Sequence, residues 1–390
     1  MFVNVAILKE RRPHESRVAL VPSVAPKLIE LGARLHMERG AGNAIGMDDS
    51  EFPDVTFADD AAHMVRQADL VLAVQPPRLE IARAMKPGSV LVCFLYPEGQ
   101  SDLIGCLLDR RITSFAMERI PRISRAQAMD ALSSQSALAG YYAVQRGTTE
   151  MRRVLPKLTT AAGVVGPATV LVMGLGVAGL EAIATAHRLG AVVEGYDVRP
   201  ETEEQARSLG ASFVKTGIKA AGKGGYARML TREENDEVAS VLTRHIQGAD
   251  LVITTASVPG KPAPRLISAS QCAGMKRGAV IVDLSADGGG NCEATIPGET
   301  TRIGHVTIVA PLNVPSLIGE DASLLYAGNV ANLLGLMLKS NVLSMDWDDE
   351  ILAATVFTHD GRRRSESSET EAFPSNAADK RALRHLAGSV

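Results

Sequence analysis

The feature that most constrains the fold is a glycine-rich turn between a buried strand and a helix. Residues 168–173 form a short apolar run, typical of a strand in a parallel sheet. Gly174, Gly176 and Gly179 follow with G-x-G-x-x-G spacing, and a helical stretch comes next. The first glycine permits a tight turn, the second lets the backbone approach a pyrophosphate, and the third lets the helix pack against the strand. We expect the amides at the helix N-terminus to face the phosphates.

A second strand and an acidic residue complete this pattern. The strand is expected over residues 191–196 and is followed by Asp197, about 20 residues after the glycines, where a carboxylate accepts ribose hydroxyl groups. The pattern predicts NAD(H) rather than NADP(H), because a carboxylate repels a 2′-phosphate, although Arg199 nearby weakens that preference. A strand–helix turn without a ligand is the alternative, and it leaves Asp197 unexplained. The residues expected to contact the cofactor here are Gly174, Leu175, Gly176, Val177, Gly179, Asp197, Val198 and Arg199.

Length and composition narrow the class of protein. At 390 residues the chain is long enough for two domains, each with its own core. A net charge of −3 with 22% charged residues gives no sign of nucleic-acid binding. No apolar run is long enough to span a bilayer, and the N-terminus is typical of a first strand rather than a signal peptide. The four cysteines and the histidines lack metal-ligand spacing, so we expect no metal site and reduced thiols in a cytoplasmic protein.

Strands and helices alternate along the chain, which predicts an α/β fold with parallel sheets. We expect two Rossmann-like domains. Residues 1–136 plus 313–357 form a discontinuous first domain, residues 137–312 form the NAD(H)-binding domain, and the cofactor lies in the cleft between them. Residues 358–390 are expected to be a mobile polar tail, and residues 217–232 a mobile flap or a disordered insertion. Helices are expected at 22–31, 101–109, 124–146 and 324–339, and strands at 2–8, 33–37, 70–74, 90–94, 112–115, 251–255, 279–284 and 306–310.

Other segments resemble a known family. Residues 9–13 (KERRP) with Arg17 are similar to the start of the alanine dehydrogenase and nicotinamide nucleotide transhydrogenase superfamily. Residues 121–135 (PRISRAQAMDALSSQ) closely resemble the signature of the NAD(H)-binding component of proton-translocating transhydrogenases. Further matches are GYDVR at 195–199, GGYA at 224–227, PGKPAP at 259–264 and GGNC at 289–292. The resemblance covers about residues 1–355.

The resemblance implies a function shared between subunits. In this family, hydride passes between NAD(H) on a chain like this one and NADP(H) on a beta subunit, coupled to proton translocation by a membrane-spanning subunit. The matching segments end before any membrane span, and in this respect the chain resembles the separate subunit often called alpha-1. The resemblance also implies a homodimer and a cytoplasmic location, with attachment to the inner (cytoplasmic) membrane through the partner subunits.

The resemblance further implies roles for residues near Arg122. We expect Arg122, Gln127, Asp130 and Ser133 to share one side of a helix and to hold the nicotinamide and its ribose. Gln127 would contact the carboxamide or the facing nucleotide, and Asp130 would pair with Arg122 and orient it. Helix capping by Ser124 and Gln127, or a plain salt bridge, is the alternative. The remaining expected contacts are Ile123, Ser124 and Arg125, then Gly225 and Tyr226 on the flap, and Ala256 and Val258 after a strand.

Two rival functions remain open. An alanine dehydrogenase needs polar groups for its substrate and a proton carrier. Arg17 is available for that role, but no lysine lies in residues 73–76, and Tyr96 stands where the family has a histidine. Asp287 alone cannot do the chemistry, whereas hydride transfer between two nicotinamide rings needs only positioning and exclusion of water. The second rival is a non-catalytic, NAD-responsive regulatory module.

Overall fold

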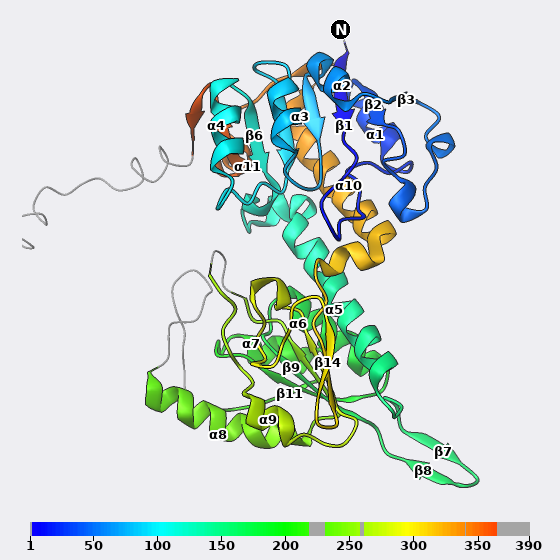
Figure 1. Cartoon of the computed structure of the whole chain (residues 1–390), viewed down its shortest axis with the longest axis vertical. Coiled ribbons are helices and arrows are strands. Elements are labelled where there is room, and N and C mark those ends of the chain that lie inside the picture. Colours follow the sequence, from blue (N-terminus) through cyan, green and yellow to red (C-terminus); the bar gives the residue numbers. More distant parts are fainter. Residues whose placement is uncertain (1, 218–230, 258–260, 340, 365–390) are drawn as a thin grey trace, which may run out of the picture.

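The computed structural model describes residues 2–217, 231–257, 261–339 and 341–364, which form two α/β domains (Figure 1). The first sheet has the strand order β19-β18-β6-β5-β4-β1-β2-β3, and the second has the order β11-β10-β9-β12-β13-β15-β14. The predicted fold class, two α/β domains with largely parallel sheets, is confirmed. All four cysteines are free.

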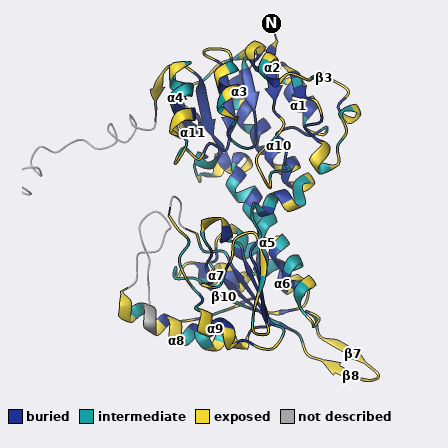
Figure 2. Cartoon of the chain, in the orientation of Figure 1, coloured by how far each residue is buried: buried dark blue, intermediate teal, exposed yellow. Residues whose placement is uncertain are grey.

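The first sheet comprises β1 (Val3–Ile7), β2 (Ala33–Glu38), β3 (Val55–Ala58), β4 (Leu70–Leu72), β5 (Val90–Cys93), β6 (Thr113–Ala116), β18 (Val356–His359) and β19 (Arg362–Arg363). Around it lie α1 (Ala25–Glu30), α2 (Ala61–Gln67), α3 (Leu79–Ala84), α4 (Ser101–Asp109) and α11 (Glu350–Thr355). Alternate residues of its strands are buried in two apolar clusters, one on each face, which is why the strands are continuous apolar runs (Figure 2).

The second sheet comprises β9 (Thr169–Met173), β10 (Val192–Tyr196), β11 (Ser212–Phe213), β12 (Leu251–Thr254), β13 (Val280–Asp283), β14 (Thr300–Ile303) and β15 (Val306–Val309). Its helices are α6 (Val177–Arg188), α7 (Thr202–Ser208), α8 (Arg232–Gly248) and α9 (Ala269–Ala273). The order β11-β10-β9-β12-β13-β15 repeats the order β3-β2-β1-β4-β5-β6 of the first sheet. In such doubly wound sheets, ligands bind at the carboxyl ends of the strands where the strand order reverses.

Two long helices join the domains (Figure 1). The helix α5 (Ala131–Glu150) packs against α6 of the second domain and against α10 (Gly319–Met337). The helix α10 in turn inserts Tyr326, Val330 and Leu334 into the core of the first domain. Three short 3-10 turns flank these helices: η3 (Met117–Arg119), η4 (Ser124–Met129) and η7 (Val314–Ile318).

Several local expectations are wrong. Residues 124–146 are not one helix, because the turn η4 ends at Met129 and α5 starts at Ala131. The sheets are not wholly parallel, since β14, β18 and β19 pair antiparallel with their neighbours. The tail does not begin at residue 358, because β18 and β19 extend the first sheet as far as Arg363. The remainder of the predicted tail, and most of the predicted flap, lie outside the described residues.

A projecting hairpin is among the elements that were not predicted from the sequence. The strands β7 (Leu158–Thr160) and β8 (Gly163–Val165) form an antiparallel hairpin that projects from the second domain (Figure 1). Every residue of the two strands is exposed, including the apolar Leu158, Val164 and Val165. The two strands pair only with each other, and an isolated two-stranded ribbon is at most marginally stable in water. The other residue boundaries proposed for the domains stay a prediction.

Candidate cofactor-binding site

The glycine turn has the geometry that its sequence predicts. Gly174 directly follows β9 with a φ of +96°, and Gly176 precedes the first turn of α6. A Cβ atom on Gly179 would lie 1.9 Å from the carbonyl oxygen of Gly174, so helix and strand approach closely only because this residue is glycine. A Cβ on Gly176 would meet no atom within 4 Å. The open space beside the backbone therefore lies at the middle glycine, where a phosphate group needs it.

The acid after β10 is tied to this turn. Asp197 Oδ2 accepts a hydrogen bond of 2.7 Å from the amide of Leu175. The guanidinium of Arg199 also binds the carboxylate, through Nε at 3.0 Å and Nη2 at 2.9 Å. The side chain of Asp197 is only 6% exposed. The carboxylate thus lies at the predicted edge of the sheet and orients the glycine turn, with Arg199 as its ionic partner.

The loop after β12 closes the other side of the turn. Thr255 Oγ1 donates to the carbonyl of Gly174 at 2.7 Å. Asn291, which is fully buried, accepts from the amide of Ala256 at 3.0 Å and donates to its carbonyl at 2.8 Å. Asn291 lies in the GGNC segment, and no role for it was predicted from the sequence. The expected contacts Val258, Gly225 and Tyr226 lie outside the described residues.

A pocket of about 230 Å³ lies between α5 and this loop. It joins the first turn of α6 to the ends of β12 and β13, so it lies where a group extending from the glycine turn would reach α5. None of its lining residues was among the predicted cofactor contacts, because the residues of α5 face the pocket only after the helices have packed together. The lining residues are Ser136, Ala139, Ala178, Thr255, Ser257, Lys261, Ala263, Leu284, Ser285, Asp287 and Gly288.

The segment from Arg122 to Ser133 differs from the predicted helix. Asp130 caps the N-terminus of α5, since its carboxylate accepts hydrogen bonds from the amide of Ser133 at 2.9 Å and from its hydroxyl at 2.6 Å. No ion pair joins Asp130 to Arg122 among the residues that the structure describes, so the predicted pair is absent. The break at Asp130 also means that Arg122 and Gln127 do not share a helix face with Ser133.

The alternative of a capping box at Ser124 is also wrong, because the turn η4 begins without a side-chain cap. Arg125 binds Asp349, at the start of α11, through two hydrogen bonds of 2.8 and 2.9 Å. Ile123 packs against the core of the first domain. Arg122, Ser124 and Gln127 are exposed, and none of them lines the pocket beside α5.

A buried polar network lies where α5 and α10 meet the first domain. The side chain of Arg17 is 4% exposed and binds Glu15 Oε1 at 2.8 Å and Oε2 at 2.6 Å. The same guanidinium donates to Gln135 Oε1 at 2.8 Å and to Asn313 Oδ1 at 3.3 Å. Asn313 has a left-handed φ of 42° and donates to the Glu15 carboxylate at 3.0 Å.

The pKa values of the acids in and beside this network shift in opposite directions. Hydrogen bonds and charge attraction from Arg17 outweigh burial and lower the pKa of Glu15 to about 2. Burial raises the pKa of Glu10 to about 7, against two hydrogen bonds from the amides of Val74 and Gln75. Burial also raises the pKa of Asp287, which accepts the amide of Asn313 at 3.2 Å. Arg17 therefore has its charge matched internally, by Glu15.

Neither a metal site nor a membrane span is found within the described ranges. They contain no group of three or more His, Cys, Asp or Glu side chains placed to hold a metal ion. No helix among them is both long and apolar enough to cross a membrane.

The sequence matches a family of nicotinamide-dependent proteins. Residues 6–139 match the family Alanine dehydrogenase/PNT, N-terminal domain, and residues 143–366 match Alanine dehydrogenase/PNT, C-terminal domain. The first of the separate chains of the NAD(P) transhydrogenase alpha subunit of Rhodospirillum rubrum is 44% identical over 373 residues, which are 92% of this chain and 97% of that protein. Alanine dehydrogenase of Halomonas elongata is 28% identical, over 92% of this chain and 94% of its own length.

Solved structures agree with these matches. The transhydrogenase of Sinorhizobium meliloti has a TM-score of 0.83 at 42% identity, over 92% of this chain and 99% of that one. An L-alanine dehydrogenase has a TM-score of 0.74 at 25% identity, over 93% of this chain and 96% of that one.

The repeated strand order and the glycine turn define a two-domain α/β protein of the dinucleotide-binding class. The chain belongs to the alanine dehydrogenase/PNT family and is a homologue of NAD(P) transhydrogenase alpha subunits. The predicted resemblance is confirmed.

Proposed function

We propose that this chain is the NAD(H)-binding subunit of a proton-translocating NAD(P) transhydrogenase and exchanges hydride with NADP(H) on a partner subunit. The observation that carries the proposal is the open space at Gly176 in a turn that is otherwise tightly packed. The pocket beside α5 is lined by Ala178 in the first turn of α6 and by Thr255 after β12. A bound nicotinamide supplies the carbon that gives or takes the hydride, and the protein supplies position and exclusion of water.

The network around Arg17 favours this function over oxidation of an amino acid. A substrate carboxylate would need a guanidinium with free donors. Arg17 is nearly inaccessible, and Glu15, Gln135 and Asn313 occupy its donors. The absence of a lysine at Gln75 and of a histidine at Tyr96 removes the other polar groups that the dehydrogenase reaction needs.

We assign the hydride-transfer step to Arg122, Gln127 and Asp130. Arg122 and Gln127 are exposed, and their side chains make no hydrogen bond or ion pair to the described residues. They are therefore available to a nucleotide presented by a partner subunit. Asp130 holds the start of α5 next to them and acts with Ser133 as a cap. The adenosine and pyrophosphate would lie on Gly174–Gly179 and Asp197, with Leu175, Val177, Val198 and Arg199 beside them. Ala256, Val258, Gly225 and Tyr226 complete the proposed contacts.

The proposed assembly has three kinds of contact. An NADP(H)-binding beta subunit meets the Arg122–Gln127 region, and a membrane-spanning subunit couples hydride transfer to proton movement. Both would keep the chain at the cytoplasmic face of the inner membrane. A second copy of this chain would cover the exposed apolar residues of the β7–β8 hairpin, which pairs with no other strand.

Reconstituted hydride exchange tests the proposal. The isolated chain should bind NADH but show negligible transfer until an NADP(H)-binding subunit is added. Turnover of alanine and NAD by the isolated chain would instead indicate the dehydrogenase. The variant Gln127→Asn should slow transfer much more than it weakens NADH binding, because the shorter amide reaches the facing nucleotide less well. Equal losses of both quantities would contradict the role assigned to Gln127.

A further inference from the structure

The first domain repeats a detail of the cofactor-binding domain as well as its strand order. In the second domain, the amide of Leu175 donates to Asp197, and Arg199 binds the same carboxylate. The first domain has the equivalent arrangement at its own switch point, where Ile7 pairs with Met37 as Met173 pairs with Tyr196. Counted from these pairs, Lys9 takes the place of Leu175, and Glu38 takes the place of Asp197.

The backbone contact at these equivalent positions is the same, and an arginine again binds the acid, here from the loop after β1 rather than from the segment that follows the acid. The amide of Lys9 donates to Glu38 Oε2 at 2.9 Å, and the guanidinium of Arg11 binds both carboxylate oxygens. The side chain of Glu38 is only 5% exposed. Both switch points are thus built with a buried acid that ties the loop after the central strand to the next strand. In the second domain this construction borders the cofactor site.

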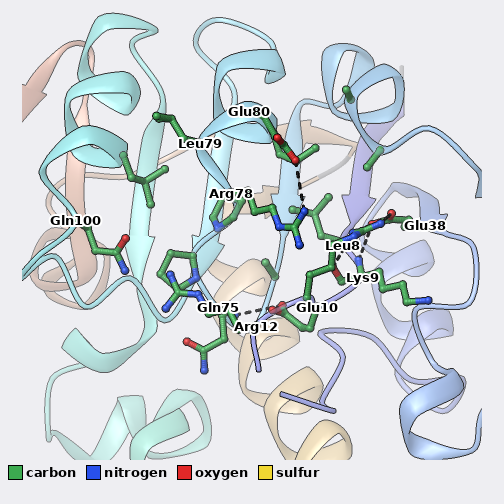
Figure 3. Close-up of a pocket in the computed structure, with 18 of the residues that line it drawn as sticks. Leu8, Lys9, Glu10, Arg12, Glu38, Gln75, Arg78, Leu79, Glu80 and Gln100 are labelled. Carbon is green, nitrogen blue, oxygen red and sulfur yellow. Dashed lines mark hydrogen bonds and ion pairs between the residues drawn. The ribbon is translucent and has the colours of Figure 1, made fainter. Parts of the chain in front are cut away.

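A pocket of about 790 Å³ opens at this place in the first domain, within the usual range of ligand sites (Figure 3). Arg12 and Arg78 lie between Gln100 on one side and Glu38 on the other (Figure 3). The two arginines come from the loops after β1 and β4, the two strands that flank the switch point.

The charges in the pocket leave these two guanidinium groups available. Six acids line the pocket. Glu38, Glu10 and Asp60 accept hydrogen bonds from backbone amides. Asp59 binds Arg39, Glu80 lies beside Arg78, and Asp102 is exposed in the first turn of α4. Among the described residues, Arg12 has no hydrogen-bond or ion-pair partner for its side chain. Arg78 lies 3.7 Å from Glu80, and both side chains are more than half exposed, so this pair is weak. The first turn of α4 also lacks a side-chain cap and faces the same pocket.

The loop after β1 differs from the glycine turn in a way that defines the ligand. Leu8 and Glu10 stand at the positions of Gly174 and Gly176. Their side chains prevent the close backbone approach that a dinucleotide pyrophosphate needs. Two arginine forks in one open pocket instead match a single terminal phosphate.

We propose that this pocket binds a phosphate monoester of a small polar organic group. Arg12 and Arg78 hold the phosphate, and the organic part extends toward Gln100. The site is separate from the crevice at Gly176, so a ligand can bind while NAD(H) is present.

Ribose 5-phosphate is a suitable probe, and its binding to the NADH-saturated protein can be followed by ³¹P NMR. NADH fluorescence in the same samples reports the cofactor site, and thermal melting shows that each variant is folded. The wild-type chain should bind the probe, and the double variant Arg12→Ala/Arg78→Ala should bind it at least about tenfold more weakly. The matched control is Arg83→Ala, an exposed arginine on α3 that does not line the pocket, and it should bind like the wild type.

Three results would overturn the proposal: no binding to the wild-type chain, equal binding by the double variant, or displacement of the probe when NADH is added. Inorganic phosphate that binds as tightly as the ester would also count against it, because the organic part would then contribute nothing. All of these results leave the assignment of NADH to the Gly176 crevice untouched.

Discussion

At the scale of single residues, the three glycines of the turn meet different steric demands. Gly179 is needed for packing, since any side chain would overlap the carbonyl oxygen of Gly174. Gly176 has a φ of −78°, which any residue adopts, and free space around its missing Cβ. Stability therefore does not require glycine at position 176, whereas a ligand that approaches the backbone does.

The variant Gly176→Ala should consequently keep the melting temperature of the wild type and bind NADH at least about tenfold more weakly, a loss of roughly 1.4 kcal/mol. Calorimetric titration and thermal melting measure the two quantities. The comparison variant Gly179→Ala should lose several degrees in melting temperature, because its Cβ collides with the backbone. Normal NADH affinity in a folded Gly176→Ala protein would show that no phosphate lies at this turn.

Glu10 predicts a pH dependence of stability. Its pKa is about 7 in the folded chain and 4.5 in the reference state, so the folded state binds more protons between these values. Stability should therefore fall as pH rises from about 4.5 to about 7, by an amount on the order of 2 kcal/mol. Glu15, with a pKa of about 2, loses its stabilising contribution only as pH falls below about 4.5.

Urea unfolding of the wild-type chain and of Glu10→Gln at pH 5 and pH 7.5 separates this contribution from the others. Raising the pH from 5 to 7.5 should lower the unfolding free energy of the wild-type chain by about 2 kcal/mol more than it lowers that of the variant. The same pH difference in both proteins would mean that the Glu10 carboxyl titrates near its ordinary value.

At the scale of elements, α5 connects the predicted catalytic segment to both domains. Its N-terminus is capped by Asp130, its middle approaches α6, and its side chains Ser136 and Ala139 line the pocket. A Cβ on Gly140 would lie 2.1 Å from the carbonyl oxygen of Ala178 in α6, so the close contact of the two helices depends on this glycine. The position of the pocket is therefore set by helix packing rather than by the glycine turn alone.

Two substitutions of Asp130 separate capping from charge. Asp130→Ala should lose about 1 kcal/mol of unfolding free energy in urea titrations, because the amide of Ser133 loses its acceptor. Asp130→Ser should restore most of that stability, since serine also caps helices. If the carboxylate also orients Arg122 during hydride transfer, reconstituted activity stays low in both variants. Recovery of activity by Asp130→Ser would show that Asp130 acts only as a helix cap.

At the scale of the whole molecule, two sheets with the same strand order are held together by α5 and α10 (Figure 1). The same strand order supports different sites in the two domains, because only the second domain carries glycines at its switch point. The β7–β8 hairpin is the element that this arrangement leaves without a packing partner.

The proposed homodimer can be tested at this hairpin. The double variant Val164→Glu/Val165→Glu should shift the chain from dimer to monomer in analytical ultracentrifugation, because charges on a buried apolar interface are not tolerated. The thermal stability of each folded domain should change little, since both side chains are exposed within one chain. The matched variant Val192→Glu alters another exposed valine, on β10, and should stay dimeric. A wild-type chain that sediments as a monomer would contradict the proposed assembly.

Local patterns in the chain were sufficient to predict the parallel strands at the centre of both sheets, the glycine turn and the position of Asp197, but not the shorter strands such as β3, β11 and β14. These features depend on hydrophobic periodicity, apolar runs and steric requirements within about 30 residues. Such patterns can be identified directly in a sequence. The break in the helix at Asp130 was missed because its spacing fits a continuous helix, while the capping bonds to Ser133 favour a new start.

Contacts between distant segments decided the remaining features. Hydrogen bonds from Arg17 to Glu15, Gln135 and Asn313 join residues up to about 300 positions apart. The hydrogen bond between Asn291 and Ala256 also joins separate segments. No local pattern records such pairs, because the free energy that selects them comes from burying polar groups together after the sheets and helices have packed.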